Sequence, residues 1–420
     1  SISAALRRPD VKLEGVRKRR LNTLHTTTTT TTTTTTRTTF KRSPIGKDRN
    51  VHNMSDDPKN DTRPALCKED VASILENFDI SADCIDVIKQ LDSYDDQNFY
   101  IKLRPDGREV LLKVTNWQDS NNTQLLGETT DMMLRLSKSV PCNVPRRTTT
   151  DSLLGTFAYR EDTGVLRYCK VRLFDFLPGE IMQPGTLTRS QAFQWGALLG
   201  RMHLALDSLE YPTIVARSFL WSWEGVIQVS QYLNVIPDDG RRALVKNVLN
   251  YYERTVFPRM KSMKRYILHG DLNERNILLN STGEVYAVLD FGDCQGGPRV
   301  WDVAVMLSYI SLVLPDIDKD LVDYFGHALA GYAAHMPDVV REHCDVETLR
   351  ALMCARLCQS LTLGLCAFEA KADPYVLTSQ ARGWPALMKF HSEPRLNIVK
   401  AWTPLLAPYQ IQIKEAATAS

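Results

Sequence analysis

The most informative pattern in this 420-residue chain lies in two neighbouring segments, YILHGDLNERNILLN at residues 266–280 and VYAVLDFGDCQGG at residues 285–297. In both, acidic and amide side chains lie directly beside apolar runs. Asp271 and Asn276 are five positions apart, and Asp290 follows Asn276 by fourteen. The apolar runs between Asn276 and Asp290 predict two short antiparallel strands that turn at STG. Such a hairpin would bring Asn276 beside Asp290, with Asp271 a few residues away.

This spacing matches what phosphoryl transfer requires. Phosphates carry dense negative charge, which Mg²⁺ neutralises while a few oxygen ligands hold the ion. A further carboxylate must face the hydroxyl that accepts the phosphoryl group. We therefore predict that Asn276 and Asp290 are Mg²⁺ ligands and that Asp271 is the catalytic base or orients the hydroxyl. Each residue alone would be an ordinary loop or turn residue, and only the combination indicates a catalytic site.

Phosphate binding also needs a cation, and Lys113 is the candidate. It lies in EVLLKVT, in the middle of an expected strand, and a buried lysine needs a carboxylate partner. Glu128, on the expected helix that follows, is the predicted partner. The alternative is that Lys113 points outward from an alternating strand. We assign Lys113 and Glu128 to nucleotide binding.

The loop over the nucleotide has no glycine-rich signature. The sequence contains neither G-x-x-x-x-G-K-[ST] nor G-x-G-x-x-G. The segment SYDDQNF at residues 93–99 is therefore the expected phosphate loop, in which backbone N–H groups and the Ser93 hydroxyl would hold phosphate. Asp95 and Asp96 would repel phosphate there unless they point away or cap the turn.

The wider pattern predicts two lobes. Residues 65–91, which include CIDVIKQL, have helical periodicity, and strands are expected on both sides of the PDG turn and within residues 153–176. After PGE at residues 178–180 the chain is mostly helical. We predict an α+β, two-lobed fold with a small β-rich N-lobe over residues 65–176 and a larger helical C-lobe over residues 177–410. A ligand site is expected between the lobes.

The first sixty residues differ from the rest. They contain a threonine tract and are predicted to be disordered, because uncharged polar repeats cannot bury a core. Residues 1–53 carry a net charge of +9, whereas the whole chain carries +2. Residues 54–420 therefore carry a net charge of −7. The basic segment is either sequence ahead of a start at Met54 or an organelle transit segment.

The motifs HGDLNERNILL, VLDFGD and WDVAV resemble the aminoglycoside phosphotransferase and choline kinase superfamily, which has a protein-kinase-like fold. More narrowly, SYDDQNFYI, LLKVTN, VRLFDFLPGE and LGRMHLAL are similar in order and spacing to the hydroxylysine kinase family, over residues 65–410. This resemblance implies transfer of the γ-phosphate of GTP or ATP to the 5-hydroxyl of 5-hydroxy-L-lysine. It also implies that Asp302 braces the catalytic loop, although Asp302 is equally an acid favoured at a helix N-terminus.

Two other interpretations stay open. The acceptor could be another amino alcohol or an aminoglycoside, such as choline, ethanolamine or homoserine, or the protein could be a catalytically inactive nucleotide-binding regulator. Inactive relatives commonly lack the lysine, the base or a metal ligand, and all of these are present here.

A cationic acceptor suits the acidic balance of residues 54–420. Asp293 and Glu180 are candidate partners for its ammonium groups, and Arg299 for its carboxylate. A choline-type acceptor would instead need an aromatic cage. The candidate walls of such a cage are Trp221, Trp223, Tyr309 and Trp384.

The remaining patterns favour structural roles. We expect His269 to fix the loop rather than act as a base, and Cys354, Cys358 and Cys366 to be small core residues rather than metal ligands. Nine scattered cysteines favour reduced thiols and a cytoplasmic location, with a mitochondrial one if residues 1–53 are a transit segment. We expect no nucleic-acid partner, and no membrane partner because the sequence pattern shows no apolar run long enough to span one.

Overall fold

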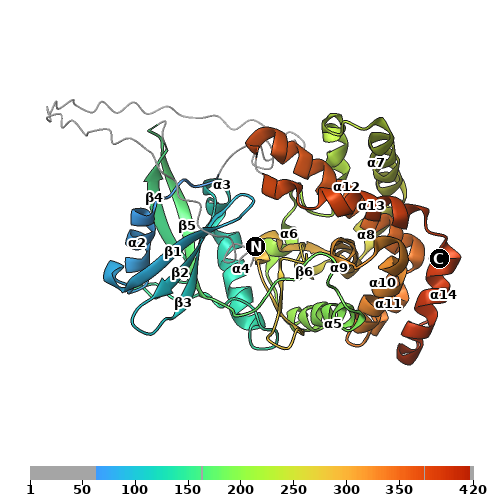
Figure 1. The fold of residues 1–420 in the computed structure, drawn as a ribbon, viewed down its shortest axis with the longest axis horizontal. Coiled ribbons are helices and arrows are strands. Elements are labelled where there is room, and N and C mark those ends of the chain that lie inside the picture. Colours follow the sequence, from blue (N-terminus) through green and yellow to red (C-terminus); the bar gives the residue numbers. More distant parts are fainter. Residues whose placement is uncertain (1–62, 162–163, 373, 417–420) are drawn as a thin grey trace, which may run out of the picture.

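The fold has two lobes joined by one crossing of the chain, and Figure 1 shows the sheet at one end and the helices at the other. The structure is a computed structural model that describes residues 63–161, 164–372 and 374–416. The predicted disorder of residues 1–60 lies outside this part of the chain. The expected α+β architecture, with an N-terminal antiparallel sheet and a helical C-terminal part, is confirmed.

The N-lobe is a five-stranded sheet in the order β1-β2-β3-β5-β4, and every neighbouring pair is antiparallel. An apolar core lies between the sheet and α2. Helix α4 lies between the sheet and the C-lobe (Figure 1). The elements are α2 (Lys68–Glu76), β1 (Ile85–Leu91), β2 (Gln97–Leu103), β3 (Glu109–Val114), α3 (Trp117–Ser120), α4 (Thr123–Leu136), β4 (Gly155–Arg160) and β5 (Leu166–Asp175).

The prediction of helix through residues 65–91 was wrong in its second half. Helix α2 ends at Glu76, and Asp79 takes a left-handed φ of 59° that helix does not allow. CIDVIKQL then forms β1, which pairs with β2 so that Ile88 lies opposite Ile101. Its apolar residues fit a helical spacing as well as an edge strand, and only the pairing with β2 separates the two.

The C-lobe is helical, with two short two-stranded sheets. These sheets carry two loops, residues 269–276 and 289–294, which are called the central loops. Its helices are α5 (Arg189–Leu206), α6 (Pro212–Ala216), α7 (Asp239–Tyr251), α8 (Phe257–Ser262), α9 (Arg299–Val313), α10 (Ile317–Ala333), α11 (Pro337–His343), α12 (Val346–Lys371), α13 (Gln380–Ser392) and α14 (Arg395–Leu406). Its strands are β6 (Tyr266–Leu268), β7 (Ile277–Leu279), β8 (Val285–Val288) and β9 (Gln295–Gly297).

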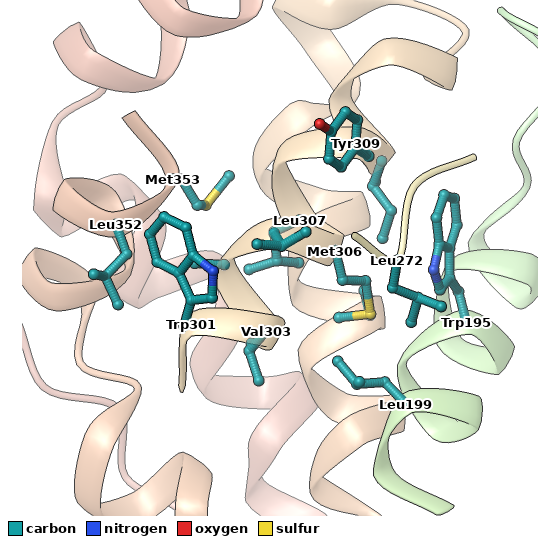
Figure 2. Packing of buried hydrophobic residues seen from close by; sticks show 14 of the residues in the cluster. Trp195, Leu199, Leu272, Trp301, Val303, Met306, Leu307, Tyr309, Leu352 and Met353 are labelled. Carbon is teal, nitrogen blue, oxygen red and sulfur yellow. The ribbon is translucent and has the colours of Figure 1, made fainter. Parts of the chain in front are cut away.

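Helix α9 is the centre of the C-lobe, because all of its residues are buried. Figure 2 shows part of this core, with Leu272 of the central loop among the same buried cluster as Trp195 of α5 and Met306 of α9. Leu272 is fully buried and directly follows Asp271 in the sequence. The core therefore anchors the loop that carries the predicted base.

Helix α12 corrects one expectation from the sequence. Its segment Val346–Ala370 is long and apolar enough to cross a membrane by length and composition alone, which we did not anticipate. However, 89% of the relevant window is buried inside the protein. Cys354, Cys358 and Cys366 lie fully or almost fully buried in this helix, as expected of core residues.

Helices α5 and α10 cross at a distance that only glycine permits. A Cβ atom on Gly196 would lie 1.8 Å from the carbonyl oxygen of Ala328, and one on Gly331 would lie 1.9 Å from that of Phe193. Because the obstructing atoms belong to the backbone of the opposite helix, a side chain would push the two helices apart.

We predict that Gly196→Ala lowers the free energy of unfolding by about 1–3 kcal/mol, because overpacking must separate α5 from α10. Gly127→Ala is the matched control, since Gly127 lies inside α4 with open space where an alanine methyl group would lie. That control should raise the free energy of unfolding by about 0.5–1 kcal/mol through helix propensity alone. Urea denaturation of the two variants measures both changes. Equal stabilities would contradict this account of the helix crossing.

Candidate active site

A cavity of about 330 Å³ lies between the two lobes. Its N-lobe wall comes from β2, β3, β5 and the loop before β2, and its C-lobe wall comes from the central loops and α12. The predicted residues Ser93, Lys113, Asp271, Asn276 and Asp290 all line it. Glu128 does not belong to the lining.

The predicted hairpin is present and sets the geometry of the cleft floor. Strands β7 and β8 pair with Ile277 opposite Val288. The Leu289 N–H then donates to the carbonyl oxygen of Asn276 at 2.8 Å. Asp290, the residue after Leu289, therefore lies close to Asn276 at the open end of the hairpin. Asp290 has a left-handed φ of 54°, and its Oδ1 accepts a hydrogen bond from Gly292 N at 3.2 Å.

Asp271 and Asn276 are connected within the loop. Asn276 Nδ2 donates to the backbone oxygen of Asp271 at 2.8 Å and to its Oδ2 at 3.2 Å. Asn273 Nδ2 also donates to Asp271 Oδ2, at 2.7 Å. Because Asn276 uses its amide nitrogen in these bonds, its Oδ1 is the atom left for a ligand. The side-chain oxygens of Asn276 and Asp290 are the hard donors that Mg²⁺ prefers, so these residues fit that ion.

A buried carboxylate braces this loop, as expected of Asp302. Its two oxygens accept hydrogen bonds from His269 N at 2.7 Å and Gly270 N at 2.9 Å, and His203 Nε2 lies 3.1 Å away. Burial would raise the pKa of Asp302, but the hydrogen bond with His203, the nearby imidazoles and the Gly270 N–H together lower it. Helix α9 thus holds an ionised carboxylate beneath the loop.

His269 is structural, as its sequence context suggested. Its side chain is fully buried, and Nε2 lies 3.0 Å from the carbonyl oxygen of Leu289. Nδ1 accepts a hydrogen bond from Asp271 N at 3.2 Å, and burial lowers the pKa of the ring. The imidazole therefore links the loop to the hairpin end that carries Asp290.

Lys113 lies in the cleft, but its predicted partner was wrong. Its Nζ is 2.7 Å from Asp290 Oδ1 and 3.2 Å from Asp96 Oδ2. Burial would lower the pKa of Lys113, but the two carboxylates raise it above the usual value. Burial would likewise raise the pKa of Asp290, which Lys113 instead lowers to about 2. Both groups are therefore charged, and the ion pair joins the lobes.

Glu128 has a different role. Its Oε2 accepts hydrogen bonds from the N–H groups of Thr213 and Ile214, at 2.9 and 3.0 Å, and its Oε1 accepts one from Thr213 Oγ1 at 2.6 Å. These bonds satisfy free N–H groups at the start of α6, as a helix cap does. Asp96 takes the place beside Lys113 instead, and its Oδ1 accepts a hydrogen bond from Asn116 N at 2.9 Å. The expected repulsion of phosphate by Asp96 is thus balanced by a cation.

Arg356 is a site residue that the sequence analysis missed. Its side chain is 1% exposed, and Nη2 donates to Asp271 Oδ1 at 2.8 Å and to Tyr309 Oη at 3.0 Å. Burial raises the pKa of Asp271 well above its usual value, although Arg356 opposes this. An arginine inside the long apolar run of α12 was the available signal, since a buried charge needs a partner.

The predicted acceptor residues are only partly in the cleft. Asp293 lines it, whereas Glu180 is exposed at the hairpin and lies outside the lining. Arg299 was wrongly predicted to bind a carboxylate there: it forms an ion pair with Asp207, and its guanidinium stacks 3.7 Å from the ring centre of Tyr266. The arginines that line the cleft are instead Arg172, Arg217, Arg275 and Arg356.

The aromatic candidates also divide. The cleft lining includes Trp221 and Tyr309 but neither Trp223 nor Trp384, which are buried. The Arg356 guanidinium lies 5.4 Å from the ring centres of both Trp221 and Tyr309. These two rings therefore already contact a cation of the protein itself, which argues against a cage built from them for a quaternary ammonium.

Residues 87–337 match the phosphotransferase enzyme family, and the chain belongs to this family. It is therefore a kinase that transfers a phosphoryl group from a nucleoside triphosphate to an alcohol group of a small molecule. Hydroxylysine kinase of Mus musculus is 24% identical over 374 residues, which cover 84% of this chain and 96% of that protein.

Two solved structures share the fold. A microcompartment-associated aminopropanol kinase is 19% identical, with a TM-score of 0.57 over 77% of this chain and 98% of its own. Amicoumacin kinase, solved with AMP-PNP, Ca²⁺ and amicoumacin, is 19% identical, with a TM-score of 0.54 over 73% of this chain and 87% of its own. The protein-kinase-like fold implied by the motifs is thus confirmed.

We predict that Asp96→Asn weakens the affinity for a nucleoside triphosphate about tenfold, because Lys113 loses one of its two carboxylate ion-pair partners. The matched variant Glu128→Gln should change that affinity less than about threefold, since its amide oxygen can still cap α6. Isothermal titration with GTP and with ATP measures both. A larger loss for Glu128→Gln than for Asp96→Asn would restore the pairing expected from sequence.

Proposed function

We propose that this enzyme transfers the γ-phosphate of GTP, or of ATP, to the 5-hydroxyl of 5-hydroxy-L-lysine, with Mg²⁺ bound to the nucleotide. The observation that carries the proposal is the convergence of Lys113, Asp271, Asn276 and Asp290 on one cleft between the lobes. Similarity to hydroxylysine kinase of Mus musculus across most of both chains supports the choice of acceptor.

Each of these residues has a defined role in the proposal. Asn276 and Asp290 hold Mg²⁺, which when bound supplies neutralising charge at the phosphate oxygens. Lys113 contacts the phosphates, and Ser93 borders them from the opposite loop. Asp271 orients the acceptor hydroxyl and receives its proton as the new oxygen–phosphorus bond forms and the bond from the γ-phosphorus to the departing nucleoside diphosphate breaks. Arg356 keeps the Asp271 carboxylate in place through the bond to Oδ1.

Charge in the cleft supports a cationic amino alcohol as acceptor. The acceptor side of the cleft carries Asp271, Glu274 and Asp293. 5-Hydroxy-L-lysine has two ammonium groups and one carboxylate, and Arg217 and Arg356 are cleft arginines whose charge suits that carboxylate. An inactive regulator is the weaker alternative, because the lysine, base and metal ligands are all present in one cleft. The free thiols of all nine cysteines favour the proposed cytoplasmic location.

A kinase assay with the full chain tests this proposal. The enzyme is incubated with Mg²⁺ and either GTP or ATP, and with 5-hydroxy-L-lysine, ethanolamine, choline, homoserine or kanamycin. We expect 5-hydroxy-L-lysine to give the highest kcat/KM, and phosphorus NMR of the product to show a phosphomonoester at C5. A kcat/KM at least tenfold higher for another acceptor would identify that acceptor as the substrate instead. Transfer to none of them would favour the interpretation as an inactive regulator.

We predict that Asp271→Asn lowers kcat by about 10²–10⁴-fold, because the carboxylate that takes the proton of the acceptor hydroxyl is lost. The dissociation constant for the nucleotide should stay within about threefold, since Asp271 contacts no phosphate in this proposal. Asp239→Asn is the matched control, because the Asp239 side chain is 92% exposed on α7. A large loss of nucleotide affinity with unchanged kcat would contradict the role of Asp271.

A further inference from the structure

Glu274 is a partly buried cleft carboxylate to which none of the roles above assigns a specific contact. It lies in the same loop as Asp271 and lines the cleft, and its side chain is 15% exposed. Its Oε2 is shielded from solvent and accepts no hydrogen bond from the described residues. Its Oε1 lies 3.7 Å from Nε of the adjacent Arg275, a long ion pair.

The contrast with Asp271 shows how unusual this is. Both oxygens of Asp271 are satisfied, Oδ1 by Arg356 and Oδ2 by Asn273 and Asn276. A shielded carboxylate oxygen without a hydrogen-bond donor is unfavourable. Among the described residues, both carboxylate oxygens of Asp271 thus have donors, whereas Glu274 Oε2 has none.

The neighbouring cations are engaged elsewhere. The Arg356 guanidinium donates to Asp271, Tyr309, Trp221 and Gln359. The Arg275 guanidinium lies 4.8 Å from the ring centre of Tyr375. A molecule in the cleft can therefore supply the donor that Glu274 Oε2 lacks among the described residues. Tyr309 and Tyr375 line the same cleft, and their rings can pack against the carbon chain of such a molecule.

We propose that Glu274 binds a primary ammonium group of the acceptor, and this inference rests on the proposed function. A primary ammonium offers three N–H donors to the carboxylate in charge-assisted hydrogen bonds. Because Glu274 and Asp271 are three residues apart in one loop, one small molecule can present its ammonium to the first and its hydroxyl to the second. A quaternary ammonium has no N–H to donate, so this site selects primary amino alcohols against choline.

The test compares wild-type enzyme and Glu274→Gln with 5-hydroxy-L-lysine and its Nα-acetyl and Nε-acetyl derivatives, each of which lacks one ammonium charge. We expect wild type to have at least about a tenfold lower kcat/KM for one of the derivatives, as loss of a hydrogen bond to a charged group predicts. In Glu274→Gln, kcat/KM for 5-hydroxy-L-lysine should fall to the level of that derivative, mainly through a higher KM. The derivative itself should change less than about threefold, because it no longer offers the ammonium.

Glu284→Gln is the matched control, since Glu284 is an exposed glutamate in the β7–β8 turn. Nucleotide affinity, measured in parallel, shows that each variant is folded. If Glu274→Gln does not fold, Glu274→Asp keeps the charge at a shorter reach and should raise KM for 5-hydroxy-L-lysine but not for the derivative. If the variants keep the full preference for 5-hydroxy-L-lysine over both derivatives, the inference is wrong while the proposed function stands. Failure of wild type to phosphorylate any amino alcohol would instead remove the proposed function.

Discussion

The site depends on the hydrogen bonds that Asp302 accepts from the backbone of the catalytic loop. Its carboxylate, on α9, is fully buried. It accepts hydrogen bonds from His269 N and Gly270 N, and His203 Nε2 lies within hydrogen-bond distance of it. A buried charge in this position is stabilised only while all of these donors are present. The bonds therefore fix the loop in one conformation, and Leu272, the residue after Asp271, anchors the loop in the core. The positions of Asp271 and Asn276 follow from this constraint.

A second constraint joins the lobes through charge. Lys113 of β3 reaches Asp290 at the hairpin end, while Asp96 holds the same ammonium from the N-lobe. At the chain crossing, the backbone of Glu180 pairs with that of Leu279 in β7, and Gly179 lies too close to Leu279 for a side chain. Both links end at the β7–β8 hairpin. This short element therefore sets the distance between the N-lobe wall of the cleft and the loop that carries Asp271.

The sequence predicted the local parts of this arrangement and missed the tertiary ones. The hairpin with Asn276 and Asp290 at its end could be predicted because its strands, turn and polar residues are adjacent in the chain. The partners of Lys113 and Glu128 could not. Asp96 reaches Lys113 only through the register of β2 on β3, and Asp290 and the start of α6 approach only when the lobes assemble. Arg356 lies eighty-five positions from Asp271, and its role follows from the packing of α12 against the loop. The strand β1 was misassigned because its apolar spacing satisfies two periodicities.

The central claim is that Asn276 and Asp290 bind one divalent cation together in the cleft, close to Asp271. The most direct test is a crystal structure of the full chain with Mn²⁺ and a non-hydrolysable GTP or ATP analogue, with the ion located by its anomalous signal. The account predicts a peak at about 2.0–2.3 Å from Asn276 Oδ1 and from an Asp290 carboxylate oxygen, with phosphate oxygens completing the shell. An ion bound to the nucleotide but to neither side chain would contradict it.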